Sequence, residues 1–354
     1  MNVLIATGGT GGHIFPAIET AKALKVRGHN VSFAGVLGPA EGKIRDLGFP
    51  LYALAAHGLV DRSFKGWLNF LLTMSGAIFR SFDVVGKTAP DKIIGFGGYG
   101  AFPVVMAGIL MRCPTMIHEQ NVIPGKANVV LAKVVKKVAI SFEASRKYFS
   151  RAKTVWTGCP CHNSVSLSQA QAQAVFGLAG GKKTLVLLGG SQGSQKLNEV
   201  FFQLMEDLAA SGFQAIHMTG KKDYSAYAAR CAQANLPVKV YEFINDVSQA
   251  YTAADLVIAR AGAATVSELG ILGLAAVLVP YPFAGNHQKY NADVLSASGA
   301  ALVIEQKNLT KDSLKQAVHS LLAQGASRAA LQVKTKGLFQ KDAAFQLALV
   351  VEGL

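Results

Sequence analysis

Charged side chains are scarce in this chain of 354 residues: only 16% of its residues are charged, and acidic ones are fewer than basic ones. Hydrophobic residues make up 51% of the chain. A composition of this kind excludes an intrinsically disordered protein, because enough apolar surface is present to offset the entropy lost on folding. The length is sufficient for two domains of ordinary size, each with its own core.

Cysteine is also rare, and four cysteines in a chain this long exclude the disulfide framework of a small secreted protein. The first residues, Met1–Ala6, carry no basic segment, and their apolar run is too short for a signal peptide. We therefore expect the protein to remain in a reducing cytoplasm. The segment 159–162, Cys-Pro-Cys-His, has residue types that bind metals, but no second ligand pair stands at a usable spacing, so we expect no metal there.

The shortage of acidic residues is concentrated in one half of the chain. Residues 1–157 hold 19 Lys and Arg against 8 Asp and Glu, a net charge of +11, whereas the remainder holds 16 against 13, or +3. The first half should therefore meet any large anionic partner, such as nucleic acid, an acidic membrane surface or a charged lipid-linked substrate. No basic run interleaved with aromatic residues is present, which disfavours nucleic acid.

The stretch Gly66–Phe79 carries no charge, but it is shorter than the about 20 apolar residues that a membrane-spanning helix needs. At helical spacing its apolar residues form one broad stripe, flanked by Arg62 and further cations. A core helix is one interpretation. An apolar patch rimmed by cations also suits insertion into an anionic membrane surface, and the net charge of this half favours that interpretation. The predicted membrane patch comprises Lys65, Trp67, Leu68, Leu71, Leu72, Ile78, Phe79, Arg80 and Phe82.

Short β-rich runs alternate with helical patterns along almost the whole chain, which predicts βαβ units and parallel sheets. The expected strands cover residues 3–6, 31–34, 51–54, 93–96, 115–118, 138–141, 154–156, 184–188, 215–218, 239–243, 256–258, 276–279 and 301–303. The predicted fold class is α/β, with two Rossmann-like, doubly wound parallel-sheet domains facing across a cleft. We place them at residues 1–157 and 158–339, with a last helix at about 340–354 packing back on the first.

One arrangement occurs twice: an apolar run, a glycine-rich turn and the start of a helix. The turns are residues 7–13 (Thr-Gly-Gly-Thr-Gly-Gly-His) and 189–194 (Gly-Gly-Ser-Gln-Gly-Ser). Unpaired N–H groups and the helix dipole make each a site for an anion, so a diphosphate ligand is expected. The first turn has Ile14 where a dinucleotide fingerprint has its third glycine, and no acidic residue ends the second strand, which disfavours a nicotinamide cofactor. Pro16 suits the first turn of a helix, so His13 should lie just before that helix and face the ligand.

Three polar segments follow other predicted strands. His-Glu-Gln-Asn at 118–121 should emerge at the carboxyl end of its strand, where open α/β sheets bind ligands. In the segment 260–268, Thr265 and Ser267 can offer hydroxyl and N–H groups to phosphate oxygens, and Glu268 can accept both hydroxyls of a ribose. The amides and the imidazole at 286–291 suit sugar hydroxyls.

Five motifs in this order closely resemble the MurG family of N-acetylglucosaminyltransferases, which complete the lipid-linked disaccharide precursor of peptidoglycan. They stand at residues 8–13 (Gly-Gly-Thr-Gly-Gly-His), 118–121 (His-Glu-Gln-Asn), 189–193 (Gly-Gly-Ser-Gln-Gly), 265–268 (Thr-Val-Ser-Glu) and 287–292 (His-Gln-x-x-Asn-Ala). The resemblance spans essentially the whole chain. It implies the glycosyltransferase B architecture, with UDP-N-acetylglucosamine held mostly by the second domain and the lipid-diphosphate acceptor meeting the first.

The implied reaction is an inverting transfer of N-acetylglucosamine to the 4-hydroxyl of N-acetylmuramic acid in undecaprenyl-pyrophosphoryl-MurNAc-pentapeptide (lipid I), which forms lipid II. A related transferase acting on another lipid acceptor is the alternative. The resemblance implies a peripheral enzyme on the cytoplasmic face of the bacterial inner membrane, with cell-wall synthesis proteins as possible partners. No Asp-x-Asp pair occurs, so no obligatory metal or cofactor is expected, although free Mg²⁺ can assist.

Site residues follow from the same resemblance. His13 is the expected base, because the unperturbed pKa of histidine lies near working pH, and Glu119 is the alternative. Where the family has Gly-Asn-Pro-x-Arg, this chain has Gly-Cys-Pro-Cys-His at 158–162, so His162 replaces a donor-binding arginine. The residues expected around the acceptor diphosphate are Gly8, Gly9, Gly11 and Gly12. Those expected around the donor are Thr10, Gly11, Gly12, Asn121, His162, Ser191, Gln192, Ile244, Ala263, Ala264, Thr265, Val266, Ser267, Glu268 and Gln288.

Overall fold

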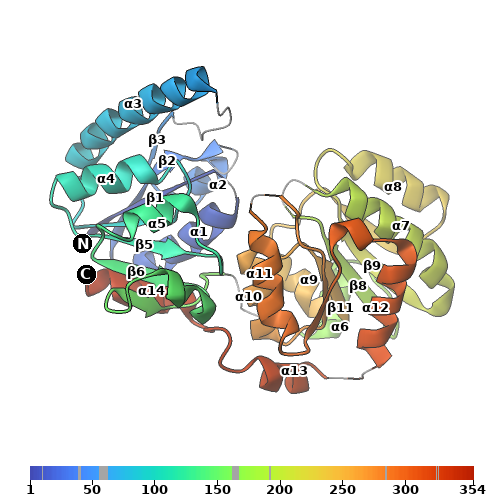
Figure 1. Ribbon diagram of the computed structural model, residues 1–354. Coiled ribbons are helices and arrows are strands. Elements are labelled where there is room, and N and C mark those ends of the chain that lie inside the picture. The colour runs from blue at the N-terminus through green and yellow to red at the C-terminus, as the bar shows by residue number, and fades with distance from the viewer. Residues whose placement is uncertain are drawn as a thin grey trace. The chain divides into compact units, whose positions relative to one another are not determined.

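The computed structural model describes residues 1–9, 11–38, 41–55, 63–161, 167–190, 193–283, 285–323, 325 and 327–354, with backbone alone at 64–67, 70 and 71. The chain divides into two compact units (Figure 1). The first unit is Met1–Cys161 together with Gln340–Leu354, and the second is His162–Phe339.

The first unit contains a seven-stranded parallel sheet in the order β3-β2-β1-β4-β5-β6-β7. Its strands are β1 (Asn2–Gly8), β2 (Asn30–Val36), β3 (Leu51–Ala53), β4 (Lys92–Gly95), β5 (Thr115–Glu119), β6 (Lys137–Ile140) and β7 (Thr154–Trp156). Its helices are α1 (Gly11–Val26), α2 (Glu41–Asp46), α3 (Phe64–Thr88), α4 (Phe102–Leu110), α5 (Lys126–Leu131), the 3₁₀ helix η2 (Glu143–Tyr148) and α14 (Ala343–Glu352).

The second unit contains a six-stranded parallel sheet in the order β10-β9-β8-β11-β12-β13. Its strands are β8 (Lys183–Leu188), β9 (Phe213–Met218), β10 (Val238–Tyr241), β11 (Leu256–Ala259), β12 (Ala276–Leu278) and β13 (Ala301–Val303). Its helices are α6 (Gln169–Val175), α7 (Gln195–Leu208), η3 (Ala209–Ser211), α8 (Tyr224–Gln233), α9 (Val247–Ala253), α10 (Ala263–Leu272), α11 (His287–Ser296), η4 (Gln306–Asn308), α12 (Lys311–Ala323) and α13 (Arg328–Thr335).

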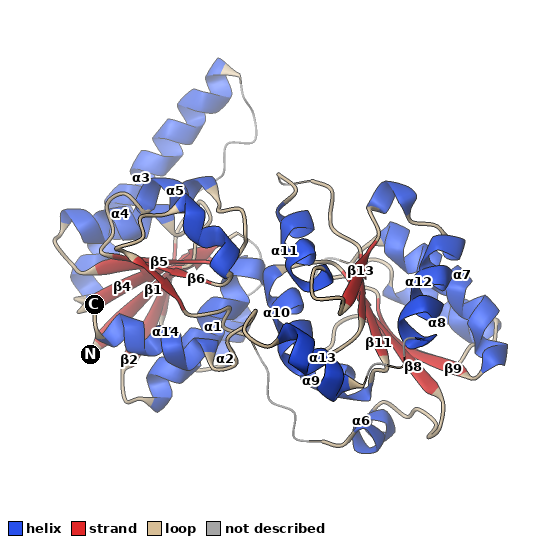
Figure 2. Ribbon diagram, turned by 60° about the horizontal axis from the view of Figure 1, so that its bottom comes forward, coloured by secondary structure: helices blue, strands red, loops and turns tan. Residues whose placement is uncertain are grey.

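Both faces of each sheet are covered by helices, as Figure 2 shows for the red strands between blue helices. In β1, Val3 and Ile5 join the core on one face, while Leu4 and Ala6 join the core on the other. Burial on both faces explains why these strands have nearly continuous apolar sequences rather than an alternating pattern. The thirteen predicted strands and the α/β fold class are confirmed.

The last helix, α14, belongs to the first unit, where it packs against α1. Leu347, Ala348 and Val351 of α14 are buried in the core that α1 also lines. At the edge of this contact, the guanidinium of Arg27 donates two hydrogen bonds of 2.6 and 2.7 Å to the carboxylate of Glu352. The red end of the chain in Figure 1 accordingly lies among the blue and green elements of the first unit.

One local prediction was wrong: His13 does not precede α1. The helix begins at Gly11, so His13 lies in its first turn and Pro16 lies inside it. Proline at that place removes a bond to the carbonyl of Gly12, and because Gly12 is exposed, water can satisfy that oxygen. The sequence signal from the proline was therefore consistent with an earlier helix start.

Among the described residues, no helix is long and apolar enough to cross a membrane. The part of the chain that the structure describes also contains no cluster of three or more His, Cys, Asp or Glu side chains placed to hold a metal ion.

Candidate active site

Both glycine-rich turns follow the strand at which the strand order of their sheet reverses. In the first unit this point lies between β1 and β4, and in the second between β8 and β11. Such a switch point is where doubly wound sheets bind ligands, because the loops leave the strands in opposite directions and open a crevice at their carboxyl ends. Each turn therefore lies at the ligand-binding edge of its own sheet.

The first glycine-rich turn is packed directly against neighbouring backbone, which explains its glycine content. A Cβ on Gly8 would lie 2.7 Å from the carbonyl oxygen of Val36, and one on Gly98 would lie 2.7 Å from the carbonyl oxygen of Gly8. Glycine is needed at both positions because any side chain would collide with main chain that cannot move aside. The close packing brings the loop after β4 against the loop after β1 and places Gly98 beside the His13 ring, with 3.4 Å from the Cβ position to Cδ2.

His13 is held by a side chain from the loop after β5. Its Nδ1 lies 2.9 Å from Oε1 of Gln120, and Nε2 of Gln120 lies 3.0 Å from Nδ1 of His118. Nε2 of His118 lies 3.0 Å from the carbonyl oxygen of Gly158. His118 and Gln120 are buried, whereas His13 is half-buried at the surface of the switch point. Burial lowers the pKa of His118 to about 4, so its ring is neutral near pH 7.

Glu119 is buried rather than exposed at the end of its strand, and its carboxylate holds the following loop. Oε1 accepts hydrogen bonds from the N–H and the side-chain amide of Asn121, at 2.9 and 3.3 Å. Oε2 accepts from the N–H of Gly125 at 3.0 Å and from Nδ2 of Asn128 at 2.8 Å. A carboxylate with four donors has its oxygens engaged, which fixes the backbone from Asn121 to Asn128.

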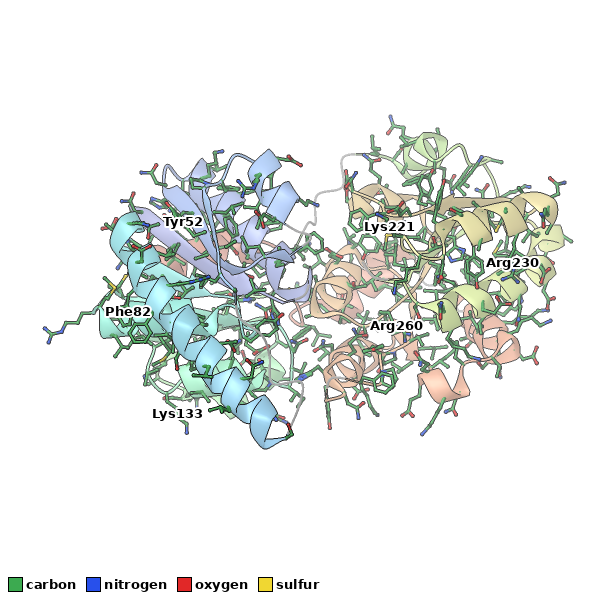
Figure 3. The ribbon with its side chains drawn as sticks, turned by 90° about the horizontal axis from the view of Figure 1, so that it is seen from above. Tyr52, Phe82, Lys133, Lys221, Arg230 and Arg260 are labelled. Carbon is green, nitrogen blue, oxygen red and sulfur yellow. The ribbon has the colours of Figure 1, made fainter. Side chains whose placement is uncertain are left out.

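In the second unit, Arg260 lies in the loop after β11 and joins it to the loops after β8, β12 and β13. Its guanidinium donates to Oγ of Ser194 at 2.6 Å, to Oε1 of Gln306 at 2.5 Å and to the carbonyl oxygen of Val279 at 3.0 Å. Its guanidinium lies 5.6 Å from the centre of the Tyr281 ring. Arg260, labelled in Figure 3, is a partly buried cation beside the second glycine-rich turn.

Gln288 connects two of the same loops through backbone N–H groups. Its Oε1 accepts from the N–H of Ala261 at 3.1 Å and from the N–H of Tyr281 at 2.9 Å. The carbonyl side of the amide is thereby engaged, so a sugar hydroxyl would meet the Nε2 side. The segment that Gln288 fixes leads directly into the N-terminus of α10.

The first turn of α10 offers the helix N-terminus that the sequence predicted. Ala263, Ala264 and Thr265 supply amides that have no acceptor within the helix, and Gly262 precedes them in extended conformation. Ser267 is buried, and its Oγ has no hydrogen-bond partner among the described residues. Val266 is fully buried and its N–H bonds to the carbonyl of Gly262, so the structure does not bring Val266 to the ligand-facing surface.

Two further predicted donor residues are Glu268, within α10, and Ile244, in the segment between β10 and α9. One carboxylate oxygen of Glu268 accepts a hydrogen bond of 2.9 Å from the hydroxyl of the buried Tyr251, which orients the carboxylate. Ile244, in the segment after β10, is 6% exposed, so its side chain packs into the unit. Thr10, His162, Ser191 and Gln192 lie outside the described residues.

The predicted membrane patch lies on α3, which projects from the sheet of the first unit (Figure 2). Leu68, Leu72 and Phe79 are 49%, 65% and 74% exposed, and they lie along one face of the helix. Phe82, labelled in Figure 3, packs against the core instead. The side chains of Lys65, Trp67 and Leu71 lie outside the described residues, whereas Ile78 is half-buried and Arg80 is exposed.

Sequence reasoning did not assign roles to Gln120, Tyr251 or Asn128, which orient the predicted residues. Gln120 stands inside a motif that was recognised, so its position was visible but its contacts were not. Tyr251 and Asn128 lie 17 and 9 residues from the carboxylates that they contact. No local pattern links them to those carboxylates, because the contacts form only when helices pack beside strand ends.

Comparison with known proteins agrees with this architecture. The glycosyltransferase family 28 N-terminal domain matches residues 3–140, and the glycosyltransferase family 28 C-terminal domain matches residues 184–347. The crystal structure of Acinetobacter baumannii MurG superimposes with a TM-score of 0.75 at 31% identity, covering 100% of this chain and 99% of that one. The two parallel-sheet domains and the matched models define a glycosyltransferase.

Two curated proteins extend the comparison. Both are named UDP-N-acetylglucosamine--N-acetylmuramyl-(pentapeptide) pyrophosphoryl-undecaprenol N-acetylglucosamine transferase. The one from Thermodesulfovibrio yellowstonii is 38% identical over 91% of this chain and 90% of that protein. The one from Prosthecochloris aestuarii is 37% identical over 100% and 99%. The chain belongs to the MurG family, and it is a hexosyltransferase, an N-acetylglucosaminyltransferase of peptidoglycan synthesis.

Proposed function

We propose that this protein transfers N-acetylglucosamine from UDP-N-acetylglucosamine to the 4-hydroxyl of N-acetylmuramic acid in lipid I, forming lipid II. The observation that carries the proposal is the position of His13 in the first turn of α1, at the switch point of the first sheet, with Nδ1 held by Gln120. A base held at a glycine-rich anion site suits an acceptor whose hydroxyl and diphosphate lie close together. The relatives' names supply the two substrates.

The reaction needs one displacement. The 4-hydroxyl oxygen attacks the anomeric carbon of the donor sugar, the bond from that carbon to the diphosphate oxygen breaks, and UDP leaves with the bonding electrons. The hydroxyl proton passes to Nε2 of His13, which is neutral before the step. Attack opposite the leaving group inverts the anomeric configuration. Of the two candidate bases, His13 is the better supported, because the oxygens of Glu119 are occupied by backbone and amide donors.

The donor diphosphate is assigned to the second unit. The amides of Ala263 to Thr265 and the helix dipole of α10 would stabilise the charge that develops on the leaving group. Ser267 supports this assignment, because its buried hydroxyl has no partner among the described residues. Glu268 would hold the ribose hydroxyls and Gln288 the sugar. Ser191, Gln192, His162 and Ile244 remain assigned to the donor from the family resemblance.

The acceptor diphosphate is assigned to the first glycine-rich turn, at Gly8, Gly9, Gly11 and Gly12. Thr10, Gly11, Gly12 and Asn121 would also contact the donor sugar. The exposed apolar face of α3 and the net charge of +11 on residues 1–157 support contact with an anionic membrane surface, where a lipid-linked acceptor is found. We therefore place the enzyme peripherally on the cytoplasmic face of the inner membrane, where other cell-wall synthesis proteins are candidate partners.

A transfer assay tests the proposal. Radiolabelled UDP-N-acetylglucosamine is incubated with the protein and a lipid I analogue, and the labelled lipid product is extracted and identified. Product formation with inverted anomeric configuration is expected. A parallel reaction with a polyprenyl diphosphate carrying a different sugar tests the alternative acceptor. Transfer to that compound, with none to the lipid I analogue, would refute the proposed acceptor while leaving the donor assignment intact.

A further inference from the structure

A continuous chain of hydrogen bonds runs from the carbonyl oxygen of Gly158 to His13. It passes from that oxygen to the ring of His118 (3.0 Å), from this ring to the side-chain amide of Gln120 (3.0 Å), and from the amide to Nδ1 of His13 (2.9 Å). His118 and Gln120 are 0% and 1% exposed. A buried chain of this kind is ordered only when every donor meets an acceptor, so its direction can be determined.

The direction is fixed first at His118. A carbonyl oxygen can only accept, so Nε2 of His118 must carry the hydrogen that bonds to Gly158. The ring is fully buried and neutral near pH 7, and a neutral imidazole carries one hydrogen. Nδ1 of His118 therefore presents a lone pair towards Gln120.

The amide of Gln120 is fixed by the same residue. Its Nε2 lies 3.0 Å from Nδ1 of His118 and 3.1 Å from the carbonyl oxygen of His118. Both of those atoms are acceptors, so the NH₂ group must face them. Oε1 is then directed at Nδ1 of His13, where it can only accept. Nδ1 of His13 consequently holds the hydrogen in the neutral ring.

We propose that Gln120 is a positioning residue that holds neutral His13 in the tautomer with its hydrogen on Nδ1 and its lone pair on Nε2. The inference rests on the proposed function, in which Nε2 of His13 accepts the proton of the acceptor hydroxyl. In the other tautomer Nε2 would already carry a hydrogen and could not take another without a prior exchange. Gln120 thus does for His13 what an orienting partner does for the histidine of a catalytic triad.

The first test needs no substrate. Protein labelled with ¹⁵N-histidine is titrated by NMR, with the His13 signals identified from their absence in His13→Gln. The nitrogen shifts of neutral His13 should report hydrogen on Nδ1 and a lone pair on Nε2. In Gln120→Leu the two tautomers should exchange. A wild-type His13 with its hydrogen on Nε2, or one with no preferred tautomer, would overturn the proposal.

The second test uses turnover. Gln120→Leu should lower kcat by about tenfold to a hundredfold, with little change in KM for UDP-N-acetylglucosamine. The range is the one typical of losing a residue that orients a metal-binding histidine. Gln120→Glu keeps an acceptor for Nδ1 and adds a charge that favours protonated His13. The acidic limb of the kcat profile should therefore move to higher pH. Both variants also remove the NH₂ group that donates to Nδ1 and to the carbonyl oxygen of His118, whereas the loop-bound Glu119 keeps its own partners.

Gln233→Glu, an exposed position at the end of α8, is the matched control for the added charge and should leave the profile in place. Wild-type kcat in folded Gln120→Leu would overturn the positioning role. If instead His13→Ala retained turnover, the proposed base would fail, and the NMR titration would still decide whether Gln120 sets the tautomer. The two failures are therefore distinguishable.

Discussion

At the scale of single residues, the side chains at the end of β5 have two different sets of contacts. His118 and Gln120 are buried and orient His13, while the Glu119 carboxylate fixes the loop from Asn121 to Asn128. Adjacent residues of one motif thus have different functions, because successive side chains of a strand point to opposite faces of the sheet. One motif thus contacts His13 through Gln120 and holds its own loop through Glu119.

Replacing His13 by Ala should lower kcat by about 10²- to 10⁴-fold, the contribution typical of a positioned general base. Binding of UDP-N-acetylglucosamine, measured by isothermal titration calorimetry, should change little, because the donor diphosphate is assigned to the second unit. His319→Ala, at an exposed position of α12, is the control. Wild-type turnover in His13→Ala would rule out His13 as the base.

Glu119→Gln should destabilise the first unit by about 1–3 kcal/mol, because an NH₂ group would replace one acceptor oxygen and leave buried donors unpaired. Urea unfolding followed by circular dichroism measures the change. Glu206→Gln, at an exposed position of α7, removes the same charge without this burial and should stay near the wild-type midpoint. Equal midpoints for the two variants would contradict the loop-holding role.

At the scale of elements, α3 has a buried face and an exposed apolar face. Ala77, Val84 and Val85 face the core, whereas Leu72 and Phe79 are exposed on the other side. The sequence pattern predicted a broad apolar arc but assigned Phe82 to the exposed patch. Phe82 packs against the core because the helix is longer than the uncharged stretch and its later turns lie over the sheet.

Leu72→Ser combined with Phe79→Ser should weaken binding to vesicles that contain anionic lipid by tenfold or more. Burying a large apolar side chain contributes about 1.5–3 kcal/mol, so losing two exceeds a tenfold change in the binding constant. Flotation with and without anionic lipid measures it. Val26→Ser, which removes an 88% exposed apolar side chain from α1, is the control. Undiminished binding of the double variant would place the membrane contact elsewhere.

At the scale of the whole molecule, each unit contains a buried neutral histidine. Burial lowers the pKa of His118 in the first unit to about 4 and that of His217 in the second to about 3. Since an unfolded histidine titrates near 6.5, the unfolded chain binds more protons than the folded chain below that pH. Stability is therefore retained above about pH 6.5 and falls progressively as the pH drops towards these folded values.

The free energy of unfolding, measured by urea titration between pH 7 and pH 5, should accordingly decline. At its steepest the slope is about 1.4 kcal/mol per pH unit for each histidine. In His217→Gln the decline of the second unit should be shallower. Circular dichroism follows the unfolding of both units, whereas tryptophan fluorescence reports only the first unit, where Trp67 and Trp156 lie. The difference between the two signals therefore follows the second unit without fragments. A midpoint for His217→Gln that tracks wild type at every pH would contradict the assignment.

The sequence by itself determined the α/β class, the thirteen strands and the two glycine-rich turns, because these depend on local patterns of apolar and turn-forming residues. It also indicated His13 and Glu119 as the polar groups beside the first turn. Only the tertiary structure decided that Glu119 binds its own loop and that Gln120 orients His13, because the first contact depends on how the loop after β5 folds back on the strand end and the second joins that loop to α1. Strand order is likewise a tertiary property: it places both turns at switch points, where unpaired N–H groups and helix dipoles meet at the edge of each sheet.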